Sequence, residues 1–188
     1  MEGLKLNEIL KTTYQSKKKG DEYFNKNNYF RDEQLSNISQ RLYYNKENNK
    51  ALITFRGTHN LFNDLPSDLD IALGTNIFGN RLNESRDFYK KAKDKYNDSQ
   101  FIIAGHSLGS HLGSKVSKDK NDKIYSYNKG SGIGTILEKA KPNEKHYRTI
   151  NDIVSFTSIG KKNTHNIKNY DINLFKTHSI KQLENIFI

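Results

Sequence analysis

The stretch from residue 101 to residue 110, Phe-Ile-Ile-Ala-Gly-His-Ser-Leu-Gly-Ser, restricts the fold of this chain more than any other. Its four leading apolar residues predict a short buried strand that runs directly into Gly105-His-Ser-Leu-Gly109, a sequence of the form Gly-x-Ser-x-Gly. In such a turn the strand reverses sharply into a helix, and the central serine is held in a strained conformation with its hydroxyl exposed. We therefore expect a strand, a turn that presents Ser107, and a short helix. The alternative is that these small residues only form a tight turn from strand to helix, with no catalytic role for Ser107.

The length and composition are those of one domain covering residues 1–188. Only 34% of the residues are hydrophobic, so we expect a compact core and a very polar surface. The chain has no cysteine, which excludes disulfides and thiolate chemistry. The first ten residues carry charges within their apolar positions, and no 18 apolar residues run together. We therefore expect neither a signal peptide nor a transmembrane segment, and a cytoplasmic or virion-associated protein.

The net charge of +10 raises the possibility of a nucleic-acid or membrane-surface binder. Lysine outnumbers arginine 25 to 6, however, and recognition of bases and phosphates favours the arginine fork. The abundance of lysine and asparagine is also typical of an A/T-rich coding sequence. We interpret the lysines as a solvated surface and expect no nucleic-acid partner.

Strand and helix patterns alternate along the chain. Residues 3–16 have partly helical spacing and predict an N-terminal helix. Residues 41–44 and 51–55, separated by turn-forming residues, predict an antiparallel hairpin. A helical stripe follows over 80–97, and further strands are expected at 123–127 and at 147–156, whose end carries Asp152. This order predicts an α/β fold, with a mostly parallel, twisted sheet, an antiparallel hairpin at one edge and flanking helices.

Residues 60–79 form a loop of about twenty residues between the hairpin and the helix. Loops of this length in compact domains are often lids or binding loops. This one is polar, with only a modest number of apolar residues, so we treat it as a candidate lid with a small apolar face.

A serine hydroxyl becomes a nucleophile when a neighbouring imidazole takes its proton, and the imidazole in turn needs a carboxylate partner. In α/β hydrolases these groups occur in the order serine, acid, histidine. His146 precedes Asp152 and breaks that order, and His111 lies one helical turn after Ser107. His165 and His178 remain as candidates for the base.

Five segments, in order, resemble motifs of the class 3 lipases, the fungal-type family of α/β-hydrolase serine esterases. Ile53-Thr-Phe-Arg-Gly-Thr58 is similar to the family's strand-end Phe-Arg-Gly-Thr, and Asp64-Leu-Pro-Ser-Asp-Leu69 to the motif that follows it, with leucine in place of tryptophan. Gly105-His-Ser-Leu-Gly109 matches the nucleophile turn at every motif position. Tyr125-Ser-Tyr-Asn128 is a degenerate counterpart of Tyr-Thr-Phe-Gly, and Arg148-Thr-Ile-Asn-Asp-Ile-Val154 resembles the segment that carries the acid.

The resemblance implies a compact α/β-hydrolase-like fold and a triad of Ser107, Asp152 and His178. His178 is preferred to His165 because it stands just before the C-terminal stretch, like the family's histidine. It also implies an oxyanion hole formed by Thr58 and the backbone N–H of Leu108. No metal or organic cofactor is expected.

The activity implied is cleavage of carboxylic esters, with lipid esters as the expected class, through an acyl-enzyme. The polar candidate lid argues against strong activity on long-chain triglyceride droplets. A smaller ester, or a phospholipid at an anionic membrane surface that attracts the lysines, fits equally well. Two alternatives stay open: hydrolysis of another acyl bond (thioester, peptide or acylated glycan), and a non-catalytic hydrolase-fold protein that binds membranes or nucleic acid.

Overall fold

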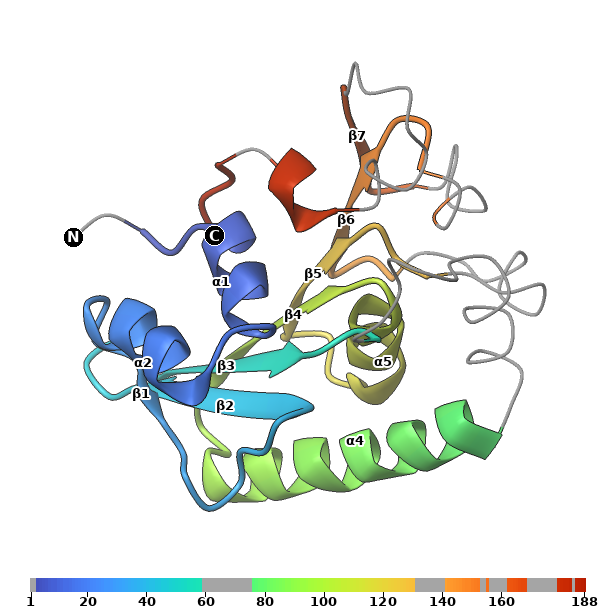
Figure 1. Cartoon of the computed structure of the whole chain (residues 1–188). Helices are drawn as coiled ribbons and strands as arrows, with labels where there is room; N and C mark the ends of the chain where they lie inside the picture. The colour runs from blue at the N-terminus through green and yellow to red at the C-terminus, as the bar shows by residue number, and fades with distance from the viewer. Residues whose placement is uncertain are drawn as a thin grey trace.

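The computed structural model describes residues 3–58, 76–130, 141–152, 155, 162–168, 179–183 and 185–188. Within these ranges the chain forms one sheet whose strands lie side by side in the order of the sequence. The strands are β1 (Phe30–Arg31), β2 (Gln40–Asn45), β3 (Lys50–Phe55), β4 (Gln100–His106), β5 (Lys123–Tyr127), β6 (Glu144–Thr149) and β7 (Thr164–Ile167). β1, β2 and β3 pair antiparallel, and every pair from β3 to β7 is parallel. The predicted α/β sheet with an antiparallel hairpin at one edge is confirmed (Figure 1).

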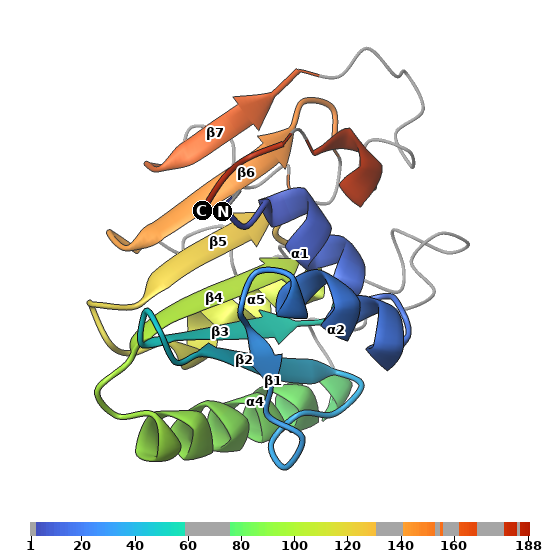
Figure 2. The ribbon, with the colours of Figure 1, turned by 90° about the vertical axis from the view of Figure 1, so that its left-hand side faces the viewer.

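Helices cover both faces of this sheet (Figure 2). α1 (Leu6–Thr12) and α2 (Lys17–Asn25) lie on one face, and α4 (Asn76–Lys95) and α5 (Leu108–Val116) lie on the other. A short 3-10 helix, η3 (Ile180–Gln182), lies near α1. No helix in the described ranges combines the length and the apolarity that a membrane crossing requires.

The core has two halves because successive strand residues point to opposite faces. Leu52 and Ile102 pack with α1 and α2, whereas Ile53, Phe101 and Ile103 pack with α4 and α5. Strands buried on both faces are expected in a parallel sheet covered by helices on either side. The central strands therefore fix the carboxyl ends of β3 and β4 rigidly with respect to α5.

The N-terminal helix is shorter than the predicted span of 3–16. Before it, Lys5 forms an antiparallel bridge with Phe187, which holds the chain extended. At its end the hydroxyls of Thr12 and Thr13 donate to the carbonyls of Ile9 and Leu10, at 2.6 and 2.7 Å. Side chains that satisfy the last free carbonyls in this way allow a helix to end.

Two further boundaries differ from the predictions. The helix predicted over 80–97 begins earlier, at Asn76, and Asn80 lies inside α4, because an exposed asparagine is tolerated within a long helix. β6 ends at Thr149 instead of continuing to residue 156, because Asn151 adopts a φ of 71° that a strand cannot contain. Most of the candidate lid, residues 59–75, lies outside the described ranges.

Candidate active site

Ser107 occupies the turn between β4 and α5 with a backbone φ of 56° and ψ of −126°. A non-glycine residue in such a conformation costs about 1–3 kcal/mol and persists only where its surroundings enforce it. Here the N–H of Ser107 donates to the carbonyl of Tyr127 at 3.0 Å, and its carbonyl accepts from the N–H of Gly130 at 3.2 Å. The segment after β5 therefore holds the strained serine from both sides, as the Gly-x-Ser-x-Gly pattern predicts.

The two glycines of the turn are required by close backbone contacts. A Cβ on Gly105 would lie 2.4 Å from the carbonyl carbon and oxygen of Gly109. A Cβ on Gly109 would lie 2.1 Å from the carbonyl oxygen of Phe55, the last residue of β3. The turn thus packs against the end of β3 with no space for a side chain between them.

The hydroxyl of Ser107 is buried and has no hydrogen-bond partner among the described residues. The same is true of the side-chain hydroxyl of Thr58, three residues after the end of β3. An unsatisfied buried hydroxyl costs about 1–3 kcal/mol, and such exceptions often mark catalytic groups. Neither hydroxyl is held by a partner in these ranges. The serine hydroxyl is buried rather than exposed as the motif predicts, so a substrate reaches it only if the residues around it move.

The predicted oxyanion-hole residues, Thr58 and Leu108, belong to the segment after β3 and to the start of α5. Leu108 is the first residue of α5, so its N–H has no acceptor within the helix. Gly57, next to Thr58, abuts the serine: a Cβ placed on it would lie 3.4 Å from the Cβ of Ser107. The backbone of the segment after β3 and the start of α5 therefore meet at the nucleophile turn.

Tyr14, which follows α1, fixes this meeting point and was not identified from the sequence. Its hydroxyl accepts the N–H of Gly57 at 3.1 Å and lies 3.0 Å from Nδ1 of His106, the neighbour of Ser107. Burial raises the pKa of Tyr14 to about 12, so the hydroxyl keeps its proton at neutral pH. In the sequence Tyr14 is one residue within the helical pattern of residues 3–16, and that pattern gives no sign of this role.

Asp152 lies in the turn after β6 and is fully buried. Its Oδ2 accepts hydrogen bonds from the backbone N–H of Ser155 at 3.1 Å and from the hydroxyl of Ser155 at 2.5 Å. Arg148 donates to the backbone carbonyl of Ser155 at 3.1 Å. The acid predicted from the sequence is thus held in a defined turn, two strands from β4 in the sheet.

Of the two histidine candidates for the base, His165 lies within the described ranges and His178 lies outside them. His165 lies on β7, is exposed, and stacks on Tyr147 with 5.2 Å between the ring centroids. β5 and β6 separate β7 from β4, which at the usual strand spacing amounts to roughly 14 Å.

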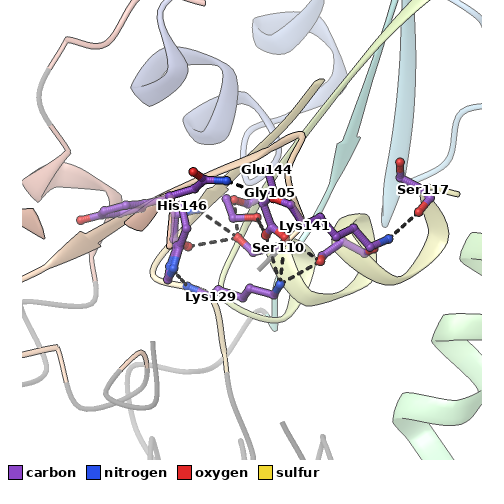
Figure 3. Close-up of polar contacts among 11 residues, drawn as sticks. Gly105, Ser110, Ser117, Lys129, Lys141, Glu144 and His146 are labelled. Carbon is purple, nitrogen blue, oxygen red and sulfur yellow. Dashed lines mark hydrogen bonds and ion pairs between the residues drawn. The ribbon is translucent and has the colours of Figure 1, made fainter. Parts of the chain in front are cut away.

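A buried ion pair between Lys129 and Glu144 holds α5, the helix that follows Ser107 (Figure 3). The Nζ of Lys129 lies 3.0 Å from Oε1 of Glu144, whose two oxygens also accept from the hydroxyls of Ser126 and Ser114 at 2.6 and 2.8 Å. Burial opposes ionisation of Glu144, but Lys129 and the two hydroxyls hold its pKa below the usual value. The cluster therefore joins α5, which begins at the serine turn, to β5 and β6.

His146, on β6, belongs to this supporting layer. Its Nε2 accepts the backbone N–H of Lys129 at 3.2 Å, which fixes the start of the segment that also bonds Ser107 (Figure 3). Burial, reinforced by the charge of Lys129, lowers the pKa of His146 to about 3. The ring is therefore neutral at physiological pH, as its acceptor role requires.

Within the described ranges no three metal-binding side chains converge on one point. The chemistry that this part of the molecule can support is that of a buried serine hydroxyl next to the N–H of Leu108, which has no acceptor within its helix.

No protein-family model matches the sequence, and no curated protein matches it. Solved structures do match. The lipase of Rhizomucor miehei in its propeptide complex has a TM-score of 0.53 at 13% identity over 80% of this chain. The lipase of Rhizopus microsporus var. chinensis has a TM-score of 0.52 at 17% identity over 79% of this chain, and covers 65% of that lipase. A mutant form of the protein MDLA from Penicillium cyclopium has a TM-score of 0.51 at 14% identity, over 88% of this chain and 78% of that one.

This chain spans about 60% of the length of the Rhizomucor lipase that it matches. At these identities the likeness concerns the arrangement of the chain in space. The α/β architecture that the motifs implied is thereby confirmed: the protein has the fold of the fungal lipases.

Proposed function

We propose that this protein is a serine hydrolase of carboxylic esters, with lipid esters as its substrate class. The observation that carries the proposal is Ser107: a buried hydroxyl without a partner among the described residues, in a strained turn between a parallel strand and a helix. Strain and an unsatisfied polar group both cost stability, so their coincidence at one residue is best explained by catalysis. The fungal lipase fold supports the choice of esters.

In the proposed reaction the Oγ of Ser107 attacks the ester carbonyl while His178 takes its proton. The N–H groups of Thr58 and Leu108 donate hydrogen bonds to the developing oxyanion, and Asp152 stabilises the charged imidazole. Collapse of the tetrahedral intermediate breaks the bond to the alcohol, which leaves with the proton from His178. Water then attacks the acyl-enzyme with the same base and releases the acid.

Two observations support these assignments. Asp152 is a fully buried carboxylate at the carboxyl end of a parallel strand, the edge of the sheet at which Ser107 also lies. His165 is exposed on β7, about three strand spacings from β4, which favours His178 as the base.

The proposal is tested with 4-nitrophenyl esters from acetate to palmitate, phospholipid vesicles, and a thioester and a peptide as rival acyl donors. We expect turnover of esters, reduced about 10⁴- to 10⁶-fold in Ser107→Ala. His178→Gln should be affected far more than the matched variant His165→Gln. Equal turnover by wild type and Ser107→Ala would refute the assignment, and preferential cleavage of the thioester or peptide would replace the substrate class.

A further inference from the structure

A cavity of about 640 Å³ lies beside the nucleophile turn. It is partly open to solvent and is lined by the turn between α1 and α2, the loop after β1, the start of β2 and the end of β3. We propose that it binds an anionic oxygen group, a phosphate or a carboxylate, carried by the substrate. The part of this inference that concerns substrate rests on the proposed hydrolase function. The presence of an anion site does not.

The cavity adjoins the nucleophile turn through one short segment. Arg56 and Tyr14 line the cavity, and the Tyr14 hydroxyl bonds the N–H of Gly57, the residue after Arg56. A Cβ added to Gly57 would lie 3.4 Å from the Cβ of Ser107. The backbone of Arg56 and Gly57 therefore links the cavity to the serine turn, and the proposal has a single substrate molecule reach from one to the other.

The charges around the cavity do not balance. Four cationic side chains line it, and the only lining carboxylate is that of Glu33. Glu33 already pairs with Lys17 at 2.6 Å and with Arg31. Arg31 also pairs with Asp21 at 2.8 Å. These groups neutralise one another and leave two arginines without a carboxylate partner in the described ranges.

Arg41 and Arg56 are those two arginines. Arg41 donates to the backbone carbonyls of Thr12 and Gln15, both at 2.9 Å, and forms no ion pair in these ranges. The guanidinium of Arg56 lies 5.5 Å from the centre of the Tyr14 ring. Its Nε is buried and has no partner among the described residues. A buried N–H donor of a charged group without an acceptor is costly. Arg56 as a whole is partly exposed, so a ligand in the cavity meets the exposed part of this residue, and Nε gains an acceptor only if the guanidinium turns toward the ligand.

Arginine is also the residue best suited to this ligand. Its planar fork binds phosphate or carboxylate through two parallel hydrogen bonds, which a lysine cannot do. The N-terminus of α2 adds to the effect: the Ser16 side chain makes no capping bond there, and Ser16 and Lys17 both line the cavity. The partial positive charge of that helix end favours an anion.

The size and polarity of the cavity indicate what the anion is attached to. At 640 Å³ it is far larger than a phosphate ion and falls within the range of small-molecule sites. Its lining residues are mostly charged or polar, but their carbon atoms contribute at least as much of the surface as their polar atoms, so the occupant combines an anionic group with a less polar part. A polar head group, or a short acid tail that ends in a carboxylate, fits this chemistry.

The binding arm of the test needs no turnover. Wild-type protein is titrated with inorganic phosphate and with glycerol 3-phosphate, by calorimetry and by following the arginine Nε–H resonances. We expect saturable binding that shifts the Arg56 Nε–H signal, weakened about 10- to 100-fold in Arg56→Gln. Lys17→Gln, at the cavity mouth, should weaken it a few-fold. Lys18→Gln, exposed on the same helix and outside the cavity, should leave it unchanged.

The kinetic arm compares esters that differ in charge. One pair is 4-nitrophenyl butyrate and the 4-nitrophenyl monoester of glutaric acid; the other is diacylglycerol, which has no phosphate, and phosphatidylglycerol, both in neutral detergent micelles. Arg56→Gln should lower kcat/KM for the anionic member at least tenfold more than for the neutral one. A change confined to the oxyanion hole would lower both members equally. Discrimination in the first pair identifies an acyl-side carboxylate, and in the second a head-group phosphate.

The outcomes separate the two proposals. Phosphate binding that depends on Arg56 but no ester hydrolysis would support the anion site and refute the hydrolase function. Ester hydrolysis without phosphate binding or charge discrimination would refute the anion site alone. Equal weakening of phosphate binding by Arg56→Gln and Lys18→Gln would also refute it, because it would indicate diffuse attraction to a basic surface.

Discussion

Replacing Gly109 by alanine tests whether the nucleophile turn depends on direct contact between α5 and the end of β3. The added methyl carbon would lie 2.1 Å from the carbonyl oxygen of Phe55 and 2.8 Å from its carbonyl carbon. Both groups are backbone, so no side-chain rotation relieves the clash. The two elements must separate by roughly 1 Å to restore an ordinary contact.

The magnitude follows from two opposing effects. Overpacking of this kind costs about 1–3 kcal/mol, whereas alanine is favoured over glycine within a helix by up to about 1 kcal/mol. We therefore expect the free energy of unfolding to fall by about 1–2 kcal/mol. The effect on catalysis should be larger, because the displaced segment leads into Thr58. A misplacement of about 1 Å at catalytic groups costs on the order of 10²-fold in rate.

The assay is urea denaturation followed by circular dichroism, together with kcat on 4-nitrophenyl butyrate. Gly79→Ala, in α4, is the matched control, because nothing lies within 4 Å of its added carbon. It should keep wild-type activity and gain up to about 1 kcal/mol in stability. If Gly109→Ala retained full activity and stability like this control, the contact between turn and strand would not position the serine.

Three further predictions concern the strain, the ion pair and the buried histidine. Ser107→Gly should raise the free energy of unfolding by about 1–3 kcal/mol, because glycine adopts a positive φ freely, whereas Ser107→Ala should give no such gain; equal urea midpoints for the two variants would contradict the assigned strain. Glu144→Gln should lower the free energy of unfolding by about 3–5 kcal/mol, because Lys129 is left without its carboxylate partner. The double variant Lys129→Met/Glu144→Leu should recover much of this loss, and a double-mutant cycle without coupling energy would argue against the ion pair. Because burial lowers the pKa of His146 from 6.5 to about 3, the unfolded chain binds the extra proton first as the pH falls, so the stability from this residue is complete above pH 6.5 and is lost below it. Between pH 7.5 and 5.5 we expect wild type to lose about 1.4 kcal/mol more than His146→Gln, and identical pH profiles in urea titrations would refute this.

Much of the fold could be predicted because its signals are local. The apolar run before Gly105 and the small residues after it specify a strand, a sharp turn and a helix within a few residues of one another. The hairpin of β2 and β3 likewise follows from two apolar runs joined by turn-forming residues. The same local information predicts Asp152 at the end of a strand; the strand ends sooner than predicted, so Asp152 lies in the turn after it.

The supporting contacts could not be predicted because they join residues that are distant in sequence. Tyr14 reaches His106 across 92 positions, and nothing near Tyr14 in the sequence indicates that contact. Glu144 and Lys129 are two charges in a chain in which 28% of residues are charged, so neither stands out as buried. Only the parallel pairing of β5 and β6 brings these two residues together.

The central claim is that Ser107 is an activated nucleophile, and covalent labelling with a fluorophosphonate tests it most directly. Intact-mass measurement should show one adduct per wild-type chain, located at Ser107 by peptide mapping, and none on Ser107→Ala. Labelling of Ser107→Ala to the same extent as wild type, or an unlabelled wild-type protein that is correctly folded, would contradict it.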